Sequence, residues 1–222
     1  MDEGERMTGI IARLEEWFPL EEAVHSEDPF STLIATILSQ NTNDRNSHRA
    51  FERLRVSFVI TPQNLSKVQP EMLRPSIEVA GLSHVKSVRI VEVSREVVDR
   101  FGGNLAQVFS LPLNEAREKL MEIRGIGPKT ADVLLAFSGG YEVMPVDTNI
   151  FRVVERLGFA QGRNYERTRL ILERLIPSPR LRRMHLVLIT LGRKVCKARR
   201  PLCSGCPVVS LCRYEAGRNH VQ

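Results

Sequence analysis

Four cysteines gather near the C-terminus in a pattern that could hold a metal. They follow the spacing C-x6-C-x2-C-x5-C, and no cysteine precedes them: Cys196, Cys203, Cys206 and Cys212. We expect no secretory signal at the polar N-terminus, so structural disulfides are disfavoured. Four thiolates can bind either zinc or an iron-sulfur cluster. The spacing therefore favours a metal centre without selecting the metal, and scattered reduced thiols are the alternative.

A glycine-rich turn carries a lysine that could act as a nucleophile. Gly125 and Gly127 permit positive φ and close backbone approach, and Pro128 suits the first position of a helix. The unsatisfied N–H groups of such a helix start can bind a phosphate. Lys129 opposes the helix dipole, which otherwise favours an acidic residue there, and the same dipole lowers the pKa of an amine, as a nucleophile requires. A plain helix-turn-helix joint with an exposed lysine is the alternative.

An aspartate further along the chain could work with this lysine. Asp147 stands where a helix N-cap belongs, and taken locally, capping is favoured over catalysis. The predicted helix from Pro128 to Gly139 spans about 18 Å. The eight loop residues that follow can extend about 27 Å. Asp147 can therefore return beside Lys129, and one aspartate can cap a helix and take part in catalysis.

The elements that must position these residues are helices. Ala131, Leu134, Leu135 and Ser138 follow helical spacing, and alternating strand patterns with tight Asn-Gly or Asp-Gly turns are absent. Glycines and prolines supply the breaks. The sequence predicts an all-α fold of about ten helices, near residues 7–18, 30–40, 43–55, 70–80, 84–101, 114–123, 128–139, 148–158, 164–176 and 179–192. The expected core residues include Leu54, Ile90, Val97, Leu120 and Leu186.

Composition excludes several classes of protein. The 222 residues are 42% hydrophobic and 26% charged, which excludes disordered, collagen-like and low-complexity chains. No apolar run approaches the roughly 18 residues that a membrane span needs. We therefore expect a cytoplasmic protein that does not enter membranes.

The net charge of +6 is distributed unevenly. Residues 178–213 contain nine basic and no acidic residues, a charge of +9, so the rest of the chain carries 6 − 9 = −3. A positive field confined to one segment suggests a surface that faces a polyanion. A solvated basic tail is the alternative reading of the charge alone.

Taken together, these motifs resemble the endonuclease III branch of the helix-hairpin-helix DNA glycosylases. The resemblance runs from about residue 10 to 215. It rests on residues 38–44 (LSQNTND), 123–132 (IRGIGPKTAD), 146–153 (VDTNIFRV), 191–193 (LGR) and the cysteine pattern.

The resemblance implies an architecture and a cofactor. A six-helix domain over residues 29–141, with its helix-hairpin-helix motif at about 114–139, is expected to pack against a cluster domain built from 1–28 and 142–222. DNA would bind in a cleft between the domains. The four cysteines would hold a 4Fe-4S cluster. The expected partner of this monomer is double-stranded DNA with a damaged base or an abasic site, which would associate it with the nucleoid.

The resemblance also implies base excision after the damaged nucleotide is flipped out. Lys129 would attack C1′ of the deoxyribose, expel the base and form a Schiff base that leads to β-elimination. Asp147 would stabilise the positive charge developing on the sugar and assist proton transfer. Related mismatch glycosylases typically have another residue at the lysine position, so Lys129 favours a bifunctional glycosylase and lyase.

The same resemblance assigns residues to DNA binding. Gly125 and Gly127 would approach the backbone, while Gln40, Asn41 and Leu82 would fill the gap left by the flipped nucleotide. For Leu82 an ordinary core leucine is the alternative. The residues expected to hold phosphates are Lys194, Lys197, Arg199 and Arg200.

Two departures from the family pattern concern the substrate. Asn149 stands where many relatives have histidine, and Gln40-Asn41 differs from the more usual Ala-Gln order. Oxidised pyrimidines, uracil and mismatched thymine would be separated by a few pocket contacts. A damaged base, specifically an oxidised pyrimidine, is the expected substrate. A monofunctional uracil or thymine mismatch glycosylase and a non-catalytic DNA-binding module are the competing functions.

Overall fold

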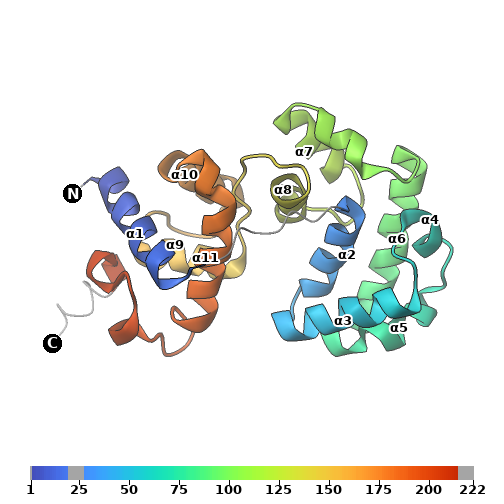
Figure 1. Ribbon diagram of the computed structural model, residues 1–222, viewed down its shortest axis with the longest axis horizontal. Coiled ribbons are helices and arrows are strands. Elements are labelled where there is room, and N and C mark those ends of the chain that lie inside the picture. Colours follow the sequence, from blue (N-terminus) through green and yellow to red (C-terminus); the bar gives the residue numbers. More distant parts are fainter. Residues whose placement is uncertain (1, 20–27, 215–222) are drawn as a thin grey trace. The chain divides into compact units, whose positions relative to one another are not determined.

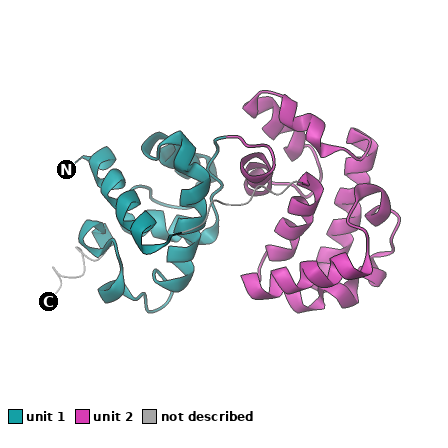
Figure 2. Ribbon diagram, in the orientation of Figure 1, with its two compact units in different colours: residues 1–24, 142–222 teal, residues 25–141 magenta. Residues whose placement is uncertain are grey.

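The computed structural model describes residues 2–19 and 28–214 (Figure 1). Within these ranges the chain forms helices joined by turns and contains no β-strand, so the all-α prediction is confirmed. Two compact units result, residues 25–141 and residues 1–24 with 142–222 (Figure 2). No helix in the described ranges is both long and apolar enough to cross a membrane.

The unit of residues 25–141 is built around one apolar helix. This helix, α2 (Pro29–Ser39), contacts α3, α6 and α8, and it buries Leu33, Ile34, Ile37 and Leu38 almost completely. Because α2 contacts three other helices, apolar residues occupy most of its faces. The other elements are α3 (Asp44–Ser57), α4 (Pro62–Leu65), α5 (Pro70–Ile77), η1 (Glu78–Ala80), α6 (Ser83–Phe101), η2 (Leu105–Ser110), α7 (Leu113–Met121) and α8 (Pro128–Phe137).

The second unit has one buried core to which four helices contribute. The elements are α1 (Glu3–Trp17), α9 (Thr148–Leu157), α10 (Tyr165–Leu175), η3 (Ser178–Arg180), α11 (Leu181–Lys194), η4 (Cys203–Gly205) and η5 (Val209–Leu211). Apolar residues of α1, α9 and α11 form one buried cluster, which includes Ile10, Val153 and Val187. Partly buried cysteines pack against the same cluster, so the cysteine segment rests on this core.

Two helix predictions were wrong for identifiable reasons. The first helix begins at Glu3 rather than residue 7, because Asp2 and Glu5 form a capping box in which each side chain accepts the other's backbone N–H. Helix α4 was not predicted, because Pro62 was interpreted only as a break. Pro62 instead occupies the first helical position after the Thr61 cap.

The remaining helices lie where the spacing predicted them, with ends that differ by up to two residues or continue as 3-10 turns. The predicted helix 70–80 ends as α-helix at Ile77, and η1 completes it. The predicted helix 179–192 starts with η3 and extends to Lys194. Of the expected core residues, Leu186 is only partly buried, whereas the other four are fully buried.

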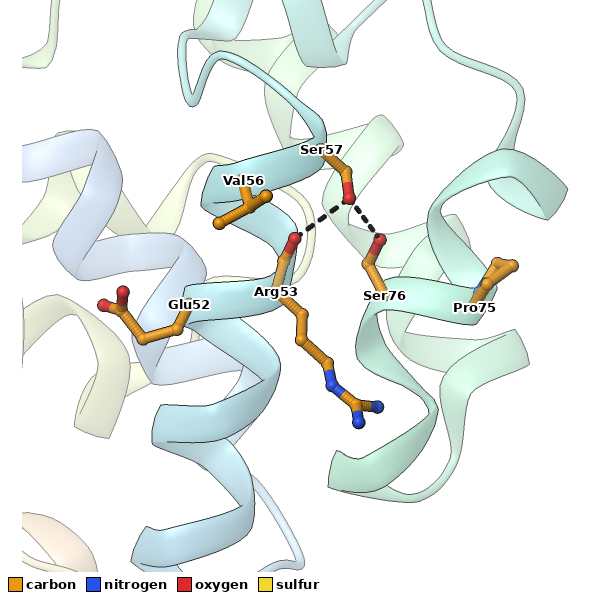
Figure 3. Close-up of a pocket in the computed structure, with 6 residues that line it drawn as sticks. All are labelled: Glu52, Arg53, Val56, Ser57, Pro75 and Ser76. Carbon is orange, nitrogen blue, oxygen red and sulfur yellow. Dashed lines mark hydrogen bonds between the residues drawn. The ribbon is translucent and has the colours of Figure 1, made fainter.

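A surface pocket lies between α3 and α5 and is lined by none of the predicted site residues (Figure 3). The Ser76 hydroxyl donates to Ser57 Oγ at 3.2 Å across the two helices, and Ser57 Oγ donates to the carbonyl of Arg53 at 3.0 Å. Val56 at its rim is 87% exposed. The pocket is therefore a feature of helix packing that is separate from the motifs.

Candidate active site and cysteine centre

The glycine hairpin forms the expected joint between α7 and α8. Gly125 adopts φ +98°, a left-handed conformation that favours glycine. Ile123 and Ile126 on either side are buried, and the N–H of Ile126 donates to the carbonyl of Ile123 at 3.0 Å. The turn is thus fixed by two buried side chains and one backbone bond.

Gly127 serves a different purpose from the one predicted. It is the N-cap of α8 and has φ −93°, so it needs no left-handed freedom, and that part of the prediction was wrong. A Cβ placed on Gly127 would meet no protein atom within 4 Å. No side chain caps the helix, and N–H groups of its first turn therefore stand at an open surface, where a phosphate can be bound.

A buried ion pair fixes the two helices of the hairpin. Arg117 Nε on α7 donates to Asp132 Oδ1 on α8 at 2.7 Å, and Asp132 is fully buried. Lys129 stands three residues before Asp132, at the second position of α8, and is half-buried. The pair therefore holds the helix that carries the candidate nucleophile.

Two further turns of this unit carry predicted DNA contacts in strained conformations. Gln40 ends α2, and Asn41 after it has φ +54°. Leu82 precedes α6 with φ +51°, follows Gly81 at φ +70°, and is 57% exposed. Leu82 is therefore not a core leucine. Left-handed conformations are rare for residues with side chains and occur where structure or function requires them.

Substitutions at Leu82 test both the strained backbone and the predicted role of the side chain in DNA. Relative to Leu82→Ala, we expect Leu82→Gly to be more stable by about 1 kcal/mol, because glycine adopts the left-handed conformation without the Cβ clash. Thermal unfolding of the two variants checks this difference. Both variants should release bases from duplex DNA more slowly than the wild type. Equal melting temperatures would contradict the strained backbone, and wild-type rates would contradict the role in DNA.

In the other unit, Asp147 is the N-cap of α9, as predicted. Its Oδ1 accepts the backbone N–H groups of Asn149 and Ile150, each at 2.8 Å. Its Oδ2 accepts the side-chain amide of Asn149 at 2.8 Å. The carboxylate is half-buried, and its orientation is fixed by three donors. Oδ2 accepts only one of these bonds, which leaves it further acceptor capacity.

Asn149 connects this carboxylate to the cysteine segment. Its Oδ1 accepts from Arg152 Nη2 at 2.9 Å, and the same guanidinium donates from Nε to the carbonyl of Cys196 at 2.8 Å. Burial is the main influence on the Arg152 pKa and lowers it, while Cys196 and Asp147 act in the opposite direction. A chain of hydrogen bonds thus runs from the N-cap carboxylate through two side chains to the backbone of the first cysteine.

The glycine of the Leu-Gly-Arg motif makes this arrangement possible. A Cβ on Gly192 of α11 would lie 2.8 Å from Asn149 Cβ and 3.3 Å from Arg152 Nη2. The carbonyl of Gly192 also accepts from Arg152 Nη2 at 2.8 Å. The motif therefore allows α11 to approach α9 closely at the residues that hold Asp147.

All four predicted cysteines line one apolar cavity. They are half-buried, none forms a disulfide, and the other lining residues are Arg156, Val195, Pro201, Leu202, Val209 and Tyr214. Arg156 of α9 donates to Cys196 Sγ at 3.3 Å and to the carbonyls of Lys197 at 2.7 Å and Ala198 at 3.1 Å. A hydrogen bond from a guanidinium to a sulfur helps to orient that sulfur as a metal ligand.

The arrangement of these sulfurs bears on the kind of metal group they suit. Among the described residues, no set of three or more histidine, cysteine, aspartate or glutamate side chains is grouped as a site for one metal ion. The four cysteines instead surround a shared cavity. Four thiols around one apolar cavity are the donor set that an iron-sulfur cluster or a zinc ion uses.

The predicted phosphate contacts lie on the surface beside this cavity. Lys194, Lys197, Arg199 and Arg200 are all exposed, and none of them takes part in an ion pair found in the described part of the chain. By contrast, Arg180 and Arg183 lie 3.5 and 3.6 Å from carboxylate oxygens of Glu15. The excess positive charge is therefore available to a ligand mainly at the cysteine segment.

Residues of the two units were predicted to form one active site. Lys129 and the strained turns belong to residues 25–141, whereas Asp147 and the cysteines belong to the other unit, so their meeting stays a prediction. Within the units, the sequence reasoning missed Lys86, Arg152 and Arg156. The two arginines follow Asp147 at spacings of five and nine residues, on one helix with it.

Comparison with known proteins agrees with these features. Residues 34–178 match the HhH-GPD superfamily of base excision DNA repair proteins. Endonuclease III of Thermotoga maritima is 35% identical over 195 residues, which cover 87% of each chain. Endonuclease III of Escherichia coli K12 is 31% identical over 207 residues, which cover 93% of this chain and 94% of the other. The chain belongs to the endonuclease III family.

Solved structures of other proteins share the fold. A trapped covalent intermediate of endonuclease III with DNA superposes with a TM-score of 0.84, covering 99% of this chain and 100% of that one at 28% identity. A thermostable thymine-DNA glycosylase, 22% identical, shares the fold with a TM-score of 0.79 and covers 96% and 98% of the two chains. The prediction of a base excision repair enzyme of the endonuclease III family, with glycosylase and lyase chemistry, is thereby confirmed.

Proposed function

We propose that this protein binds double-stranded DNA, removes a damaged pyrimidine and then cleaves the strand with Lys129 as nucleophile. The observation that carries the proposal is the position of this lysine, in the first turn of α8 behind an open, uncapped glycine joint. A phosphate bound to the N–H groups of that turn would place the adjacent sugar beside the amine.

The proposed reaction has two stages. In the first, Lys129 Nζ attacks C1′, the glycosidic C–N bond breaks with its electrons going to the base, and the base leaves after gaining a proton. The nitrogen then loses a proton, and the C1′–O4′ bond breaks as O4′ gains one, which gives a protonated Schiff base. In the second stage, C2′ loses a proton and the 3′ phosphate leaves with the electrons of the C3′–O bond. Water then hydrolyses the imine and frees Lys129.

Asp147 is proposed to assist the first stage. Its carboxylate would stabilise positive charge that develops on the sugar and accept a proton from the attacking amine. The three donors that fix this side chain keep it oriented before substrate binds. Such preorganisation avoids reorientation during the reaction.

A panel of duplexes, each with one modified base, tests the substrate and the bifunctional assignment. We expect release of an oxidised pyrimidine with strand cleavage at the same site. Release of uracil or mismatched thymine without cleavage would favour a monofunctional enzyme. Binding to every duplex with no release would leave only a DNA-binding module and would overturn the proposal.

The cysteine cavity is proposed to hold a 4Fe-4S cluster through Cys196, Cys203, Cys206 and Cys212. When bound, such a cluster would crosslink the segment that carries the exposed basic residues. Arg156 would donate a hydrogen bond to the Cys196 ligand and hold the neighbouring carbonyls in place.

Purified protein should therefore contain iron and sulfide in about equal amounts, about four of each per chain, with visible absorption. Cys203→Ser should lower the iron content and the absorption, because serine lacks a thiolate. Metal analysis and absorption spectra make the measurement. Stoichiometric zinc with no iron after anaerobic purification would reject the cluster.

The exposed basic residues of the cysteine segment should account for part of the salt dependence of DNA binding. If each contacts one phosphate, replacing Lys197, Arg199 and Arg200 with glutamine should reduce the slope of log affinity against log salt by about 2.7. Fluorescence titrations over a range of salt concentrations measure the slope.

A variant with the same change of charge provides the control. Arg163, Arg167 and Arg174 are exposed residues outside the predicted DNA surface, and replacing them with glutamine should change the slope much less. Equal slopes for the two triple variants would mean that net charge, rather than local contact, governs binding.

A further inference from the structure

Lys86 is a buried lysine that the proposed chemistry does not use. It lies on the first turn of α6 and is only 4% exposed. Lysine is almost never buried to this extent without a partner, because burial removes water from the charged amine. Burial accordingly lowers the pKa of Lys86. Such a placement calls for a specific set of acceptors.

Those acceptors are carbonyl groups from two separate turns. Lys86 Nζ donates to the carbonyl of Leu38 at 2.8 Å and to that of Ala80 at 3.0 Å. Leu38 lies in the last turn of α2, and Ala80 is the last residue of η1. Carbonyls at helix ends lack partners within their own helix, and a cation there is favoured by the helix dipole.

The two turns are the ones that carry the strained DNA-contact candidates. Asn41 follows Leu38 by three residues, and Leu82 follows Ala80 by two. Both have positive φ, and both side chains are exposed. A conformation of this kind persists only where the surrounding structure holds it. Lys86 supplies a bond to the backbone just before each of them.

The glycine hairpin lies beside the same helix. A Cβ on Gly125 would be 3.7 Å from the side chain of Arg89, one turn after Lys86. The first half of α6 therefore contacts the hairpin and both strained turns. One side chain therefore bonds both turns, in addition to the packing of α3 against η1 and of α6 against α2.

We propose that Lys86 is a positioning residue for duplex opening, which holds the turns of Gln40–Asn41 and Leu82 at a fixed spacing so that both can enter the DNA together. This inference rests on the proposed function, in which these side chains fill the gap left by a flipped nucleotide. Lys86 contacts neither the sugar nor the base in this role.

The test compares Lys86→Met with Val97→Ala. Methionine keeps an unbranched chain but donates no hydrogen bond, whereas Val97 is a fully buried residue of the same helix that bonds neither turn. Amide hydrogen exchange of the DNA-free protein reports on the turns. We expect Lys86→Met to speed amide exchange about tenfold in both turns, equivalent to about 1.4 kcal/mol. In Val97→Ala, the ratio of the exchange rates in the turns to the rates in the rest of α6 should stay as in the wild type.

Duplex opening is measured by the fluorescence of 2-aminopurine placed opposite a stable abasic-site analogue, at saturating protein. Lys86→Met should lower the opened fraction and slow base release from duplex DNA about tenfold. Borohydride trapping on single-stranded abasic DNA, which needs no opening, should stay at the wild-type level. Equal opening by Lys86→Met and Val97→Ala, or unchanged exchange in either turn, would overturn the proposal.

A second variant keeps the test decisive if methionine prevents folding. Lys86→Gln retains a donor on a shorter side chain, which we expect to bond one carbonyl but not both. It should release one turn in the exchange measurement and reduce opening. Opening at the wild-type level would again overturn the role of Lys86. If the proposed function is wrong, the wild type itself will neither open the duplex nor release a base. That result differs from a failure of the Lys86 proposal, in which the wild type remains active.

Discussion

Lys129→Gln should abolish the covalent adduct that borohydride traps between this protein and abasic DNA. Glutamine cannot form a Schiff base, so strand cleavage should fall by roughly 10³-fold or more, the scale seen when a nucleophile is removed. The hairpin should survive the change, because its turn is held by Gly125, Ile123 and Ile126 and its helices by the Arg117–Asp132 pair. Gel assays of the trapped adduct and of cleaved strand measure the effect.

Lys119→Gln is the matched control for this experiment. Lys119 lies on α7 of the same motif, and its amine lies 3.3 Å from Glu122 Oε1 on the protein surface. An exposed pair of this kind contributes little to stability. Lys119→Gln should therefore trap DNA like the wild type. A full yield of adduct from Lys129→Gln would remove Lys129 as the nucleophile and assign the role to another amine.

Asp147→Asn should slow base release by roughly 10²- to 10⁴-fold while leaving the fold intact. Asparagine is as good an N-cap as aspartate, so α9 keeps the bonds from the N–H groups of Asn149 and Ile150. The amide loses the charge and the ability to accept a proton. Single-turnover base release measures the chemical step, and thermal unfolding shows whether the helix start is preserved.

Asp28→Asn provides the matched control for the cap. Asp28 caps α2 by accepting from the N–H groups of Phe30 and Ser31, and no catalytic role is proposed for it. The same substitution there should leave base release unchanged. If Asp147→Asn is as active as Asp28→Asn, Asp147 is a cap only, which is the reading that local sequence favoured.

Much of the fold followed from local signals in the sequence. Helical spacing and breaks at residues such as Gly102 and Pro112 located ten of the helices, because an amphipathic helix records its buried face in its own residues. The errors came from boundaries. The capping box of Asp2 and Glu5 is a signal for a helix start at Glu3. Pro62 is ambiguous from sequence alone, because a proline can follow the end of one segment or occupy the first position of a helix.

The candidate site was predictable where its motifs are local and was missed where it depends on tertiary contacts. The cysteine spacing and the Asp147 cap could be identified from neighbours in sequence. Lys86 could not, because a lysine in an amphipathic helix is normally solvated, and its acceptors lie 48 and 6 residues away. Arg152 and Arg156 likewise bond the backbone of residues 196–198 only when the segment after α11 packs against α9.

The close approach at Gly192 leaves no room for a side chain. Even a methyl group there would collide with Asn149, and the displacement would pass to Asp147 on one side and, through Arg152, to the backbone of Cys196 on the other. Tolerance to mutation at this point is therefore set by space alone. A residue with no functional group thus limits which side chains can stand where α11 meets α9.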